Sequence, residues 1–201
     1  MKLVITTLLI LLTSLTKAQD LKIISRTIDS LKQVDQEVRA EFRKAINNNN
    51  DSLNLAQISV NIRYADSLNY IIIKDIFKKF GFLGLNKVSE TTSHNFWLLV
   101  QHADRHPDFQ AKVLDSMKIE VNKNNASNIN YAYLFDRVNV NSGKPQLYGT
   151  QLELNKNETS YVLKPTVDIE NLNKRRQEIN LEPIENYIKE MNEHLKGSLK
   201  N

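Results

Sequence analysis

Apolar residues recur at helical spacing through most of the chain, and this pattern limits the possible folds more than any other feature. The first apolar stripe consists of Ile24, Ile28, Leu31, Val38, Phe42 and Ala45. The second stripe consists of Ile62, Ala65, Ile72, Ile76 and Phe80. The spacing predicts two amphipathic helices, the second over 57–80 and ended by Gly81, with the polar run 47–51 as the loop between them.

A carboxylate interrupts each of these apolar stripes. Asp35 fills the step that is missing between Leu31 and Val38, and Asp66 lies within the second stripe. Arg39 follows Asp35 by four residues, which is the favourable order for an ion pair along one helix. Since a buried carboxylate is costly unless it is paired, we expect Asp35, Arg39 and Asp66 to take part in structural ion pairs.

Shorter elements follow in the remaining sequence. The patterns predict helices over 89–104, 107–121 and 181–195, and a β-hairpin over 146–154 and 160–163. Residues 131–138 fit a strand or a helix, and their spacing favours a short helix. Pro107 suits the first turn of its helix and ends the helix before it. We therefore expect an α+β fold that is mainly α-helical, with a bundle-like helical core and a small β-hairpin in the C-terminal half.

Residues 1–18 have the organisation of a secretory signal peptide. Lys2 precedes an apolar stretch, and Thr16 and Ala18 are the small residues of a cleavage site that leaves Gln19 as the first residue. The alternative, a retained anchor, is disfavoured because no stop-transfer flank follows and because a span needs about 20 apolar residues. We expect an exported protein, periplasmic or secreted, with a single domain over 19–201 and no membrane span in it.

Composition excludes several classes of function. The chain has no cysteine, which excludes disulfides, thiolate catalysis, thiolate metal sites and lipid-modified lipoproteins. Its net charge of +4 includes Lys2 and Lys17, and its lysines form no basic block, so we expect no nucleic-acid partner. Glycine-rich phosphate loops, a nucleophile elbow and the HExxH motif are absent, and we expect no cofactor.

The segment 94–108 contains three of the four histidines. His102 and His106 have the spacing of a zinc pair, to which Asp104 or His94 could add a ligand, but Pro107 makes His106 a helix-end residue. We therefore expect the two rings to diverge and predict no metal site. His102 is a candidate general acid or base, oriented by Asp104 or Asp136. A buried histidine bonded to a backbone carbonyl is the alternative.

The segment 136–151 is the second concentration of polar side chains. Arg137 offers a bidentate fork for a carboxylate or phosphate, and the alternative is an internal ion pair with Asp35 or Asp66. Gln146 and Tyr148 lie shortly before Gly149. A glycine between polar residues of a strand often marks a bulge, or a place where the backbone closely approaches another group. These residues form either a pocket wall or a bend in the hairpin.

Several motifs together resemble the family called domain of unknown function 6624. The motifs are QHAD at 101–104, AYLFDRV at 132–138, Q-x-YGTQ at 146–151, DQ-x-x-R at 35–39, the Asp66 and Asn69 pair, and RR-x-x-x-x-L-x-P at 175–183. The resemblance covers nearly the whole chain after the signal, although Asn180 replaces an expected glycine and a tryptophan-proline is missing after Gly81. The family has no assigned activity, so the resemblance selects positions without naming a function.

Three hypotheses about function remain open, and all use the residues that the resemblance selects. In the first, the chain is a cofactor-independent hydrolase or transferase with His102, Asp104 and Asp136 as catalytic residues. Its ligand-binding residues would be Gln101, Arg137, Gln146, Tyr148 and Arg176, with Arg137 or Arg176 anchoring an anionic group. In the second, the chain is an envelope domain that binds a small molecule or peptide. In the third, the polar network only specifies the fold.

Overall fold

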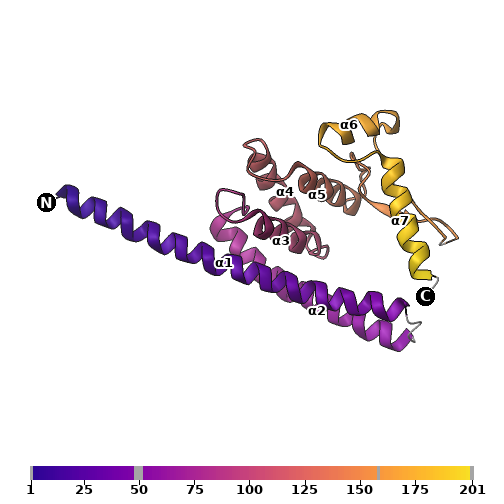
Figure 1. The fold of residues 1–201 in the computed structure, drawn as a ribbon, viewed down its shortest axis with the longest axis horizontal. Helices are drawn as coiled ribbons and strands as arrows, with labels where there is room; N and C mark the ends of the chain where they lie inside the picture. The colour runs from indigo at the N-terminus through magenta and orange to yellow at the C-terminus, as the bar shows by residue number, and fades with distance from the viewer. Residues whose placement is uncertain (1, 48–51, 158, 200–201) are drawn as a thin grey trace.

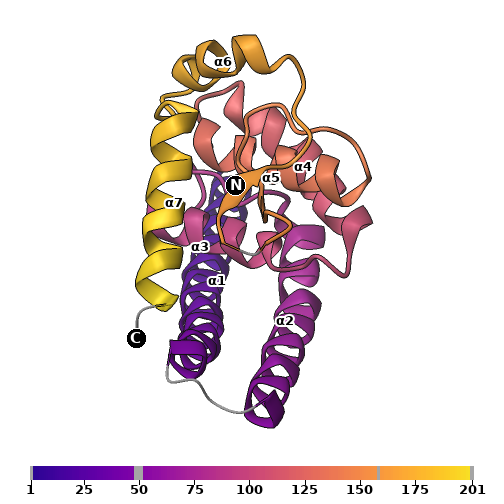
Figure 2. The same ribbon diagram turned by 90° about the vertical axis from the view of Figure 1, so that its right-hand side faces the viewer.

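Two long helices form the base of the molecule. The computed structural model describes residues 2–47, 52–157 and 159–199; most of the expected loop at 47–51 lies outside them, as do the side chains of 2–18, 47, 52–53 and 198–199. Helix α1 (Lys2–Asn47) and helix α2 (Ser52–Phe80) lie side by side and run antiparallel (Figures 1 and 2). The N-terminal part of α1 projects past the end of α2 (Figure 1).

Helix α3 (Glu90–Gln101) packs against both long helices. Ser89 caps its first turn, because the Ser89 side chain accepts a hydrogen bond from the backbone N–H of Thr92. The centre of the core lies where the three helices meet. Ile28, Ile73 and Phe96 are each fully buried there, one from each helix.

Helices α4 (Pro107–Val121) and α5 (Asn128–Asn141) form a second layer above α3 (Figure 2). Pro107 occupies the first turn of α4, where its missing N–H costs nothing. Ser127 caps α5 by accepting from the backbone N–H of Asn130. Met117 and Leu134 are fully buried between this layer and the rest of the core.

The C-terminal part carries the hairpin and the last helices. Strands β1 (Leu152–Leu154) and β2 (Tyr161–Leu163) pair antiparallel, with Leu152 opposite Leu163. A 3-10 turn η1 (Ile169–Asn171) leads into α6 (Leu172–Glu178), and α7 (Ile184–Leu199) follows along one side of the molecule (Figure 2). Helix α7 contacts β2 and α1, so it joins the hairpin to the helical base.

The fold confirms the predicted class, a mainly helical α+β chain with a small hairpin in its C-terminal half. Several details of the predicted elements were wrong. Strand β1 begins at Leu152 rather than residue 146, and α5 extends beyond 131–138 at both ends. Ile73 is the fully buried residue of α2, whereas Ile72 is 37% exposed, because one residue along a helix turns the side chain by about 100°. Helix α3 ends at Gln101 rather than residue 104, since His102 already takes the C-cap position.

None of the helices in the described ranges is both long enough and apolar enough to cross a membrane.

Gly149 stands at the tightest turn of the C-terminal part, and its replacement tests how that turn is packed. Its φ is +67°, and an added Cβ would lie 3.2–3.3 Å from side-chain atoms of Leu163, Leu172 and Ile184. We predict that Gly149→Ala lowers the free energy of unfolding by about 2–3 kcal/mol, from backbone strain plus overpacking. Urea unfolding measures this change.

Gly143→Ala is the matched control for this substitution. Gly143 also has a positive φ, +73°, but a Cβ added there meets nothing within 4 Å. We expect it to lose only the strain contribution, about 1 kcal/mol. Equal losses in the two variants would show that close packing around Gly149 does not matter.

Candidate functional site

Four polar side chains from three helices meet where the end of α3 lies against α1 and α2. We call Asp35, Arg39, Asp66 and His102 the Asp35 cluster. Arg39 Nε lies 3.3 Å from Asp35 Oδ1, and Arg39 Nη2 lies 2.5 Å from Asp66 Oδ1. His102 Nδ1 lies 2.9 Å from Asp35 Oδ1. The Asp35 side chain is fully buried, while the other three are about one-fifth exposed, so the cluster reaches solvent on one side.

The ion pairs of this cluster include the pair expected from the sequence, and they add a cross-helix link. Asp35 and Arg39 form the (i, i+4) pair along α1, and Arg39 continues to Asp66 on α2. The sequence interpretation that paired Arg137 with Asp35 or Asp66 is corrected, because Arg39 occupies that position.

Burial and charge act in opposite directions on the two carboxyl groups of the cluster. Burial raises the pKa of Asp35, but the hydrogen bond with His102 and the charges of His102 and Arg39 outweigh it and bring the pKa below its ordinary value. Burial also raises the pKa of Asp66, and there the charges of Arg39 and His102 offset only part of the rise. Asp35 is therefore the more strongly held anion.

The contact between His102 and Asp35 favours one tautomer of the imidazole. Asp35 is ionised and can only accept, so a 2.9 Å contact with Nδ1 favours the proton on Nδ1. Arg39 Nε–H is directed toward both Asp35 Oδ1, at 3.3 Å, and Nδ1, at 3.1 Å, and with the proton on Nδ1 only the bond to Asp35 is made. In neutral His102 the lone pair is therefore on Nε2, which makes Nε2 a proton acceptor.

Three members of the cluster offer ligand atoms that a metal ion could share. Atoms of Asp35, Asp66 and His102 lie within 4.8 Å of one another. The Arg39 guanidinium donates to both carboxylates and sits between them. Arg39 is thus the cation of this cluster, and the donor set does not fit a metal ion while that side chain is in place.

A second polar group ties α3 to α5 directly beside His102. Arg137 Nε donates to Gln101 Oε1 at 2.8 Å and lies 3.5 Å from Asp104 Oδ1. Asp104 also accepts from Asn141 and from Gln110, and its side chain is 48% exposed. Asp104 therefore belongs to the α3–α5 contact and does not orient His102.

Sequence reasoning missed Gln110, which holds the end of α3. Its side chain is fully buried, and Nε2 donates to the backbone carbonyls of Val100 and Gln101 as well as to Asp104. These bonds satisfy carbonyls at the C-terminal end of α3, where no helical partner remains. Gln110 lies one helical turn before the apolar Val113, and this spacing was the signal in the sequence that Gln110 is on the same face.

Asp136 organises the loop that follows α5. It is fully buried, and it accepts hydrogen bonds from the backbone N–H groups of Leu147, Tyr148 and Thr150 and from the Thr150 hydroxyl, at 2.7–3.1 Å. All of its acceptor capacity is used within the protein. The expectation that Asp104 or Asp136 orients His102 is corrected, since the orienting carboxylate is Asp35.

Arg176 and Gln146 also direct their polar atoms to the protein's own backbone. Arg176 is 1% exposed and donates to the carbonyls of Glu182, Tyr148 and Gly149. Gln146 is fully buried and bonds Gln151 and Lys164. Of the expected ligand-binding residues, these two hold the loop, whereas Arg137 and Tyr148 keep part of their surface exposed.

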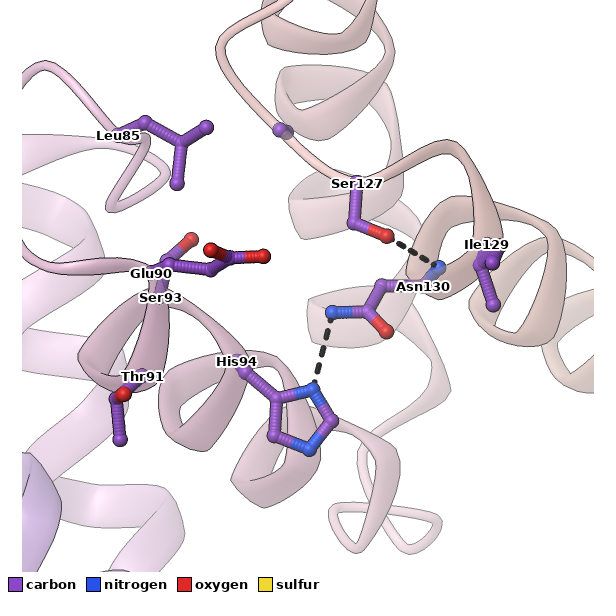
Figure 3. A pocket seen from close by; sticks show the side chains of 9 residues that line it. Leu85, Glu90, Thr91, Ser93, His94, Ser127, Ile129 and Asn130 are labelled. Atoms are coloured by element: carbon purple, nitrogen blue, oxygen red, sulfur yellow. Dashed lines mark hydrogen bonds between the residues drawn. The ribbon is translucent and has the colours of Figure 1, made fainter. Parts of the chain in front are cut away.

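The other histidines of segment 94–108 lie in different surroundings. His106 stacks on Tyr70, with ring centroids 3.3 Å apart. His94 lines a pocket of about 490 Å³ at the N-terminal ends of α3 and α5, where its Nδ1 lies 3.3 Å from Asn130 Nδ2 (Figure 3). Glu90 and Ser127 face the same pocket. The three histidines of this segment therefore lie in three separate places, and only His102 belongs to the Asp35 cluster.

The opposite pKa shifts of Asp35 and Asp66 predict opposite effects of pH on stability. The folded-state pKa of Asp35 is below the ordinary 3.8, so its contribution is fully present above pH 3.8 and is lost as the pH falls further. The folded-state pKa of Asp66 is above 3.8, so its contribution is present below pH 3.8 and is lost as the pH rises through the folded pKa.

Urea unfolding of the parent, Asp35→Asn and Asp66→Asn from about pH 6 to about pH 3 measures these contributions. As the pH falls, the stability advantage of the parent over Asp35→Asn should shrink. Over the same range, the stability of the parent relative to Asp66→Asn should rise. Parallel pH profiles for the two variants would contradict the assignment of the charges.

Comparison with known proteins gives one match. The model of a family described as a family of unknown function, DUF6624, matches residues 23–200. No curated protein and no solved structure matches the chain. The matched span contains the Asp35 cluster, the α3–α5 contact and the loop held by Asp136, and it confirms the resemblance seen in the motifs. The chain belongs to the DUF6624 family of unknown function.

Proposed function

We propose that the chain is a cofactor-independent hydrolase or transferase in which His102 is the acid–base residue. One observation supports this most directly: Nδ1 of His102 is held by the buried Asp35, while Nε2 has no hydrogen-bond partner among the described residues. The imidazole is also 18% exposed, so part of the ring reaches solvent. A carboxylate on Nδ1 keeps the imidazole in one orientation and stabilises the imidazolium that forms during proton transfer.

The reaction that fits this arrangement begins with proton transfer to Nε2. Nε2 takes a proton from the attacking water or hydroxyl, and the same nitrogen returns it to the leaving group. The chain has no cysteine, so the nucleophile is an oxygen group rather than a thiolate. Asp35 stays ionised throughout, because its pKa is below the ordinary value.

Arg137 supports a substrate that carries a negative group. Its Nε is fixed by Gln101, the residue directly before His102. Within the described ranges its two Nη groups have no hydrogen-bond partner, and the side chain is 25% exposed. A guanidinium with two free donors is suited to a carboxylate or phosphate. The buried Gln101 Nε2, also unpaired among the described residues, would gain from an acceptor on the same substrate.

Binding without catalysis is the second candidate function. The polar side-chain atoms of Asp136 and Gln146, and Nε and Nη1 of Arg176, are used within the protein, which favours a preformed surface over a mobile one. A small molecule or peptide held by Arg137 requires no proton transfer at His102. The effect of His102 on rate, as opposed to affinity, therefore separates the two proposals.

We also propose that the protein is exported, to the periplasm or the medium, through a signal over residues 1–18. The support is the charged start, the apolar stretch and the small residues Thr16 and Ala18. N-terminal sequencing of protein recovered from the envelope fraction or medium should begin at Gln19. Ala18→Lys places a large charged residue at the cleavage position and should leave the precursor uncleaved. Parent protein that keeps Met1 and stays in the cytoplasm would contradict export.

Hydrolysis of two p-nitrophenyl esters tests the enzymatic proposal. Mono-p-nitrophenyl succinate carries a carboxylate, and p-nitrophenyl butyrate does not. We expect His102→Gln to lower kcat on both by about 100-fold or more and to remove the pH dependence of the rate due to this residue. Arg137→Gln should raise KM for the succinate ester alone, because only that ester carries the anionic group.

His194→Gln is the matched control for the histidine substitution. His194 lies on α7 with its side chain 74% exposed, and it should leave both rates unchanged. The melting temperature of each variant shows whether a loss of rate comes from unfolding. Full activity in folded His102→Gln, or no hydrolysis of either ester by the parent, would refute His102 as the acid–base residue of an acyl-group hydrolase.

A further inference from the structure

A second pocket, of about 440 Å³, lies between α4, α5 and the loop held by Asp136. Its lining includes Lys118, Asn122, Asn128, Tyr131, Phe135 and Tyr148, with aliphatic side chains between them. Asn128, Tyr131 and Phe135 are spaced by three and four residues, so they share one face of α5. Arg137, which contacts α3, projects from a different face of the same helix. The pocket is therefore separate from the His102 site.

Three aromatic rings form one wall of this pocket. The ring centroids of Tyr131 and Phe135 are 5.9 Å apart with planes at 39°, and those of Phe135 and Tyr148 are 6.0 Å apart with planes at 78°. None of these pairs is stacked face to face. The arrangement leaves ring faces available to an occupant of the pocket.

The backbone of Tyr148 is fixed before any ligand binds. Asp136 accepts from the Tyr148 backbone N–H, and the buried Arg176 donates to the Tyr148 carbonyl at 2.8 Å. Gly149 follows with φ +67°, packed against side chains of three other segments. A wall that is held in place loses little conformational entropy on binding, which favours affinity.

The polar groups of the pocket can both donate and accept hydrogen bonds. In the described part of the chain, the Tyr131 and Tyr148 hydroxyls and the side-chain amides of Asn122 and Asn128 have no hydrogen-bond partner. Burial raises the pKa of both tyrosines, so their hydroxyls stay protonated at neutral pH. A purely apolar occupant would leave these groups unpaired, at a cost for each.

The charges around the pocket disfavour an anion. Asp115 lies close enough to Tyr131 to raise its pKa further, and Asp136 and Glu178 act in the same way on Tyr148, where the charge of Arg175 offsets part of the rise. Lys118, an exposed residue, is the single cation in the lining. A neutral ligand with hydroxyl groups and an apolar ring face matches both the charge and the hydrogen-bonding groups.

We propose that this pocket binds one six-membered sugar ring of a neutral glycan, with the ring stacked on Tyr148. The C–H face of a pyranose packs on an aromatic ring, and its hydroxyls pair with the phenols and the asparagine amides. The pocket volume is within the range of small-molecule sites. This binding does not depend on the acid–base role of His102.

NMR titration of the full chain with ring-labelled tyrosine tests the proposal directly. The probes are two neutral trisaccharides, chitotriose and cellotriose, and one acidic trisaccharide, trigalacturonate. We expect at least one neutral probe to shift the Tyr131 and Tyr148 signals saturably in the millimolar range. Trigalacturonate should bind more weakly than that neutral probe. Unshifted signals with both neutral probes, or tighter binding of trigalacturonate, would overturn the proposal.

Variants separate the ring from its hydroxyl. Tyr148→Ala removes the stacking surface and should weaken binding about tenfold, whereas Tyr148→Phe keeps the ring and should weaken it about threefold. Tyr148→Phe also serves as the test if the alanine variant fails to fold. Tyr64→Ala, at a residue 66% exposed on α2, is the matched control and should bind like the parent.

His102→Gln should also bind the trisaccharide with the affinity of the parent, whether or not the enzymatic proposal holds. Unchanged affinity in both Tyr148 variants would contradict the site. The two proposals therefore fail independently.

Discussion

The buried charge of Asp35 is the constraint on which the arrangement of the first three helices depends. An ionised carboxylate without solvent contact is stable only when donors surround it, and removing one partner of such a pair typically costs about 3–5 kcal/mol. Along α1, Gln36 donates to Asp35 Oδ2 at 2.8 Å and Arg39 donates to Oδ1 at 3.3 Å. His102 supplies a further contact from α3, while Arg39 extends to Asp66 on α2. The same charge thus specifies how three helices approach one another.

Asp136 is also a buried carboxylate, and it is stabilised by a different set of donors. Its partners are backbone N–H groups and one hydroxyl from the loop after α5, and no guanidinium is involved. A carboxylate bonded to successive N–H groups forces the chain to turn around it, and the positive φ of Gly149 completes that turn. Arg176 then binds the carbonyls that point the other way. One buried charge orients helices, and the other shapes a loop.

The sequence was sufficient for features that depend on near neighbours. Helical spacing placed Asp35 on a buried face and Arg39 one turn away; Pro107 marked the start of α4 and Gly81 the end of α2 correctly. The sequence was insufficient to identify contacts between residues far apart in the chain, such as His102 and Asp35, which are separated by 67 residues. Hydrogen-bonding capacity alone does not say whether Arg176 binds a ligand or its own backbone, since both offer the same acceptor oxygens. Only the fold distinguishes these uses.

The contrast between the two buried carboxylates bears on whether such networks are structural or functional. Every acceptor site of Asp136 is occupied by a donor within the protein. The effect of this charge at the surface is therefore to set the position of Tyr148. Asp35 instead holds one nitrogen of a ring that has two, and the second nitrogen of His102 remains unclaimed among the described residues. Stabilising the helices and presenting Nε2 are therefore consequences of one hydrogen bond. A role in the fold does not argue against a role in chemistry at His102, because the ring must be fixed before its free nitrogen can act.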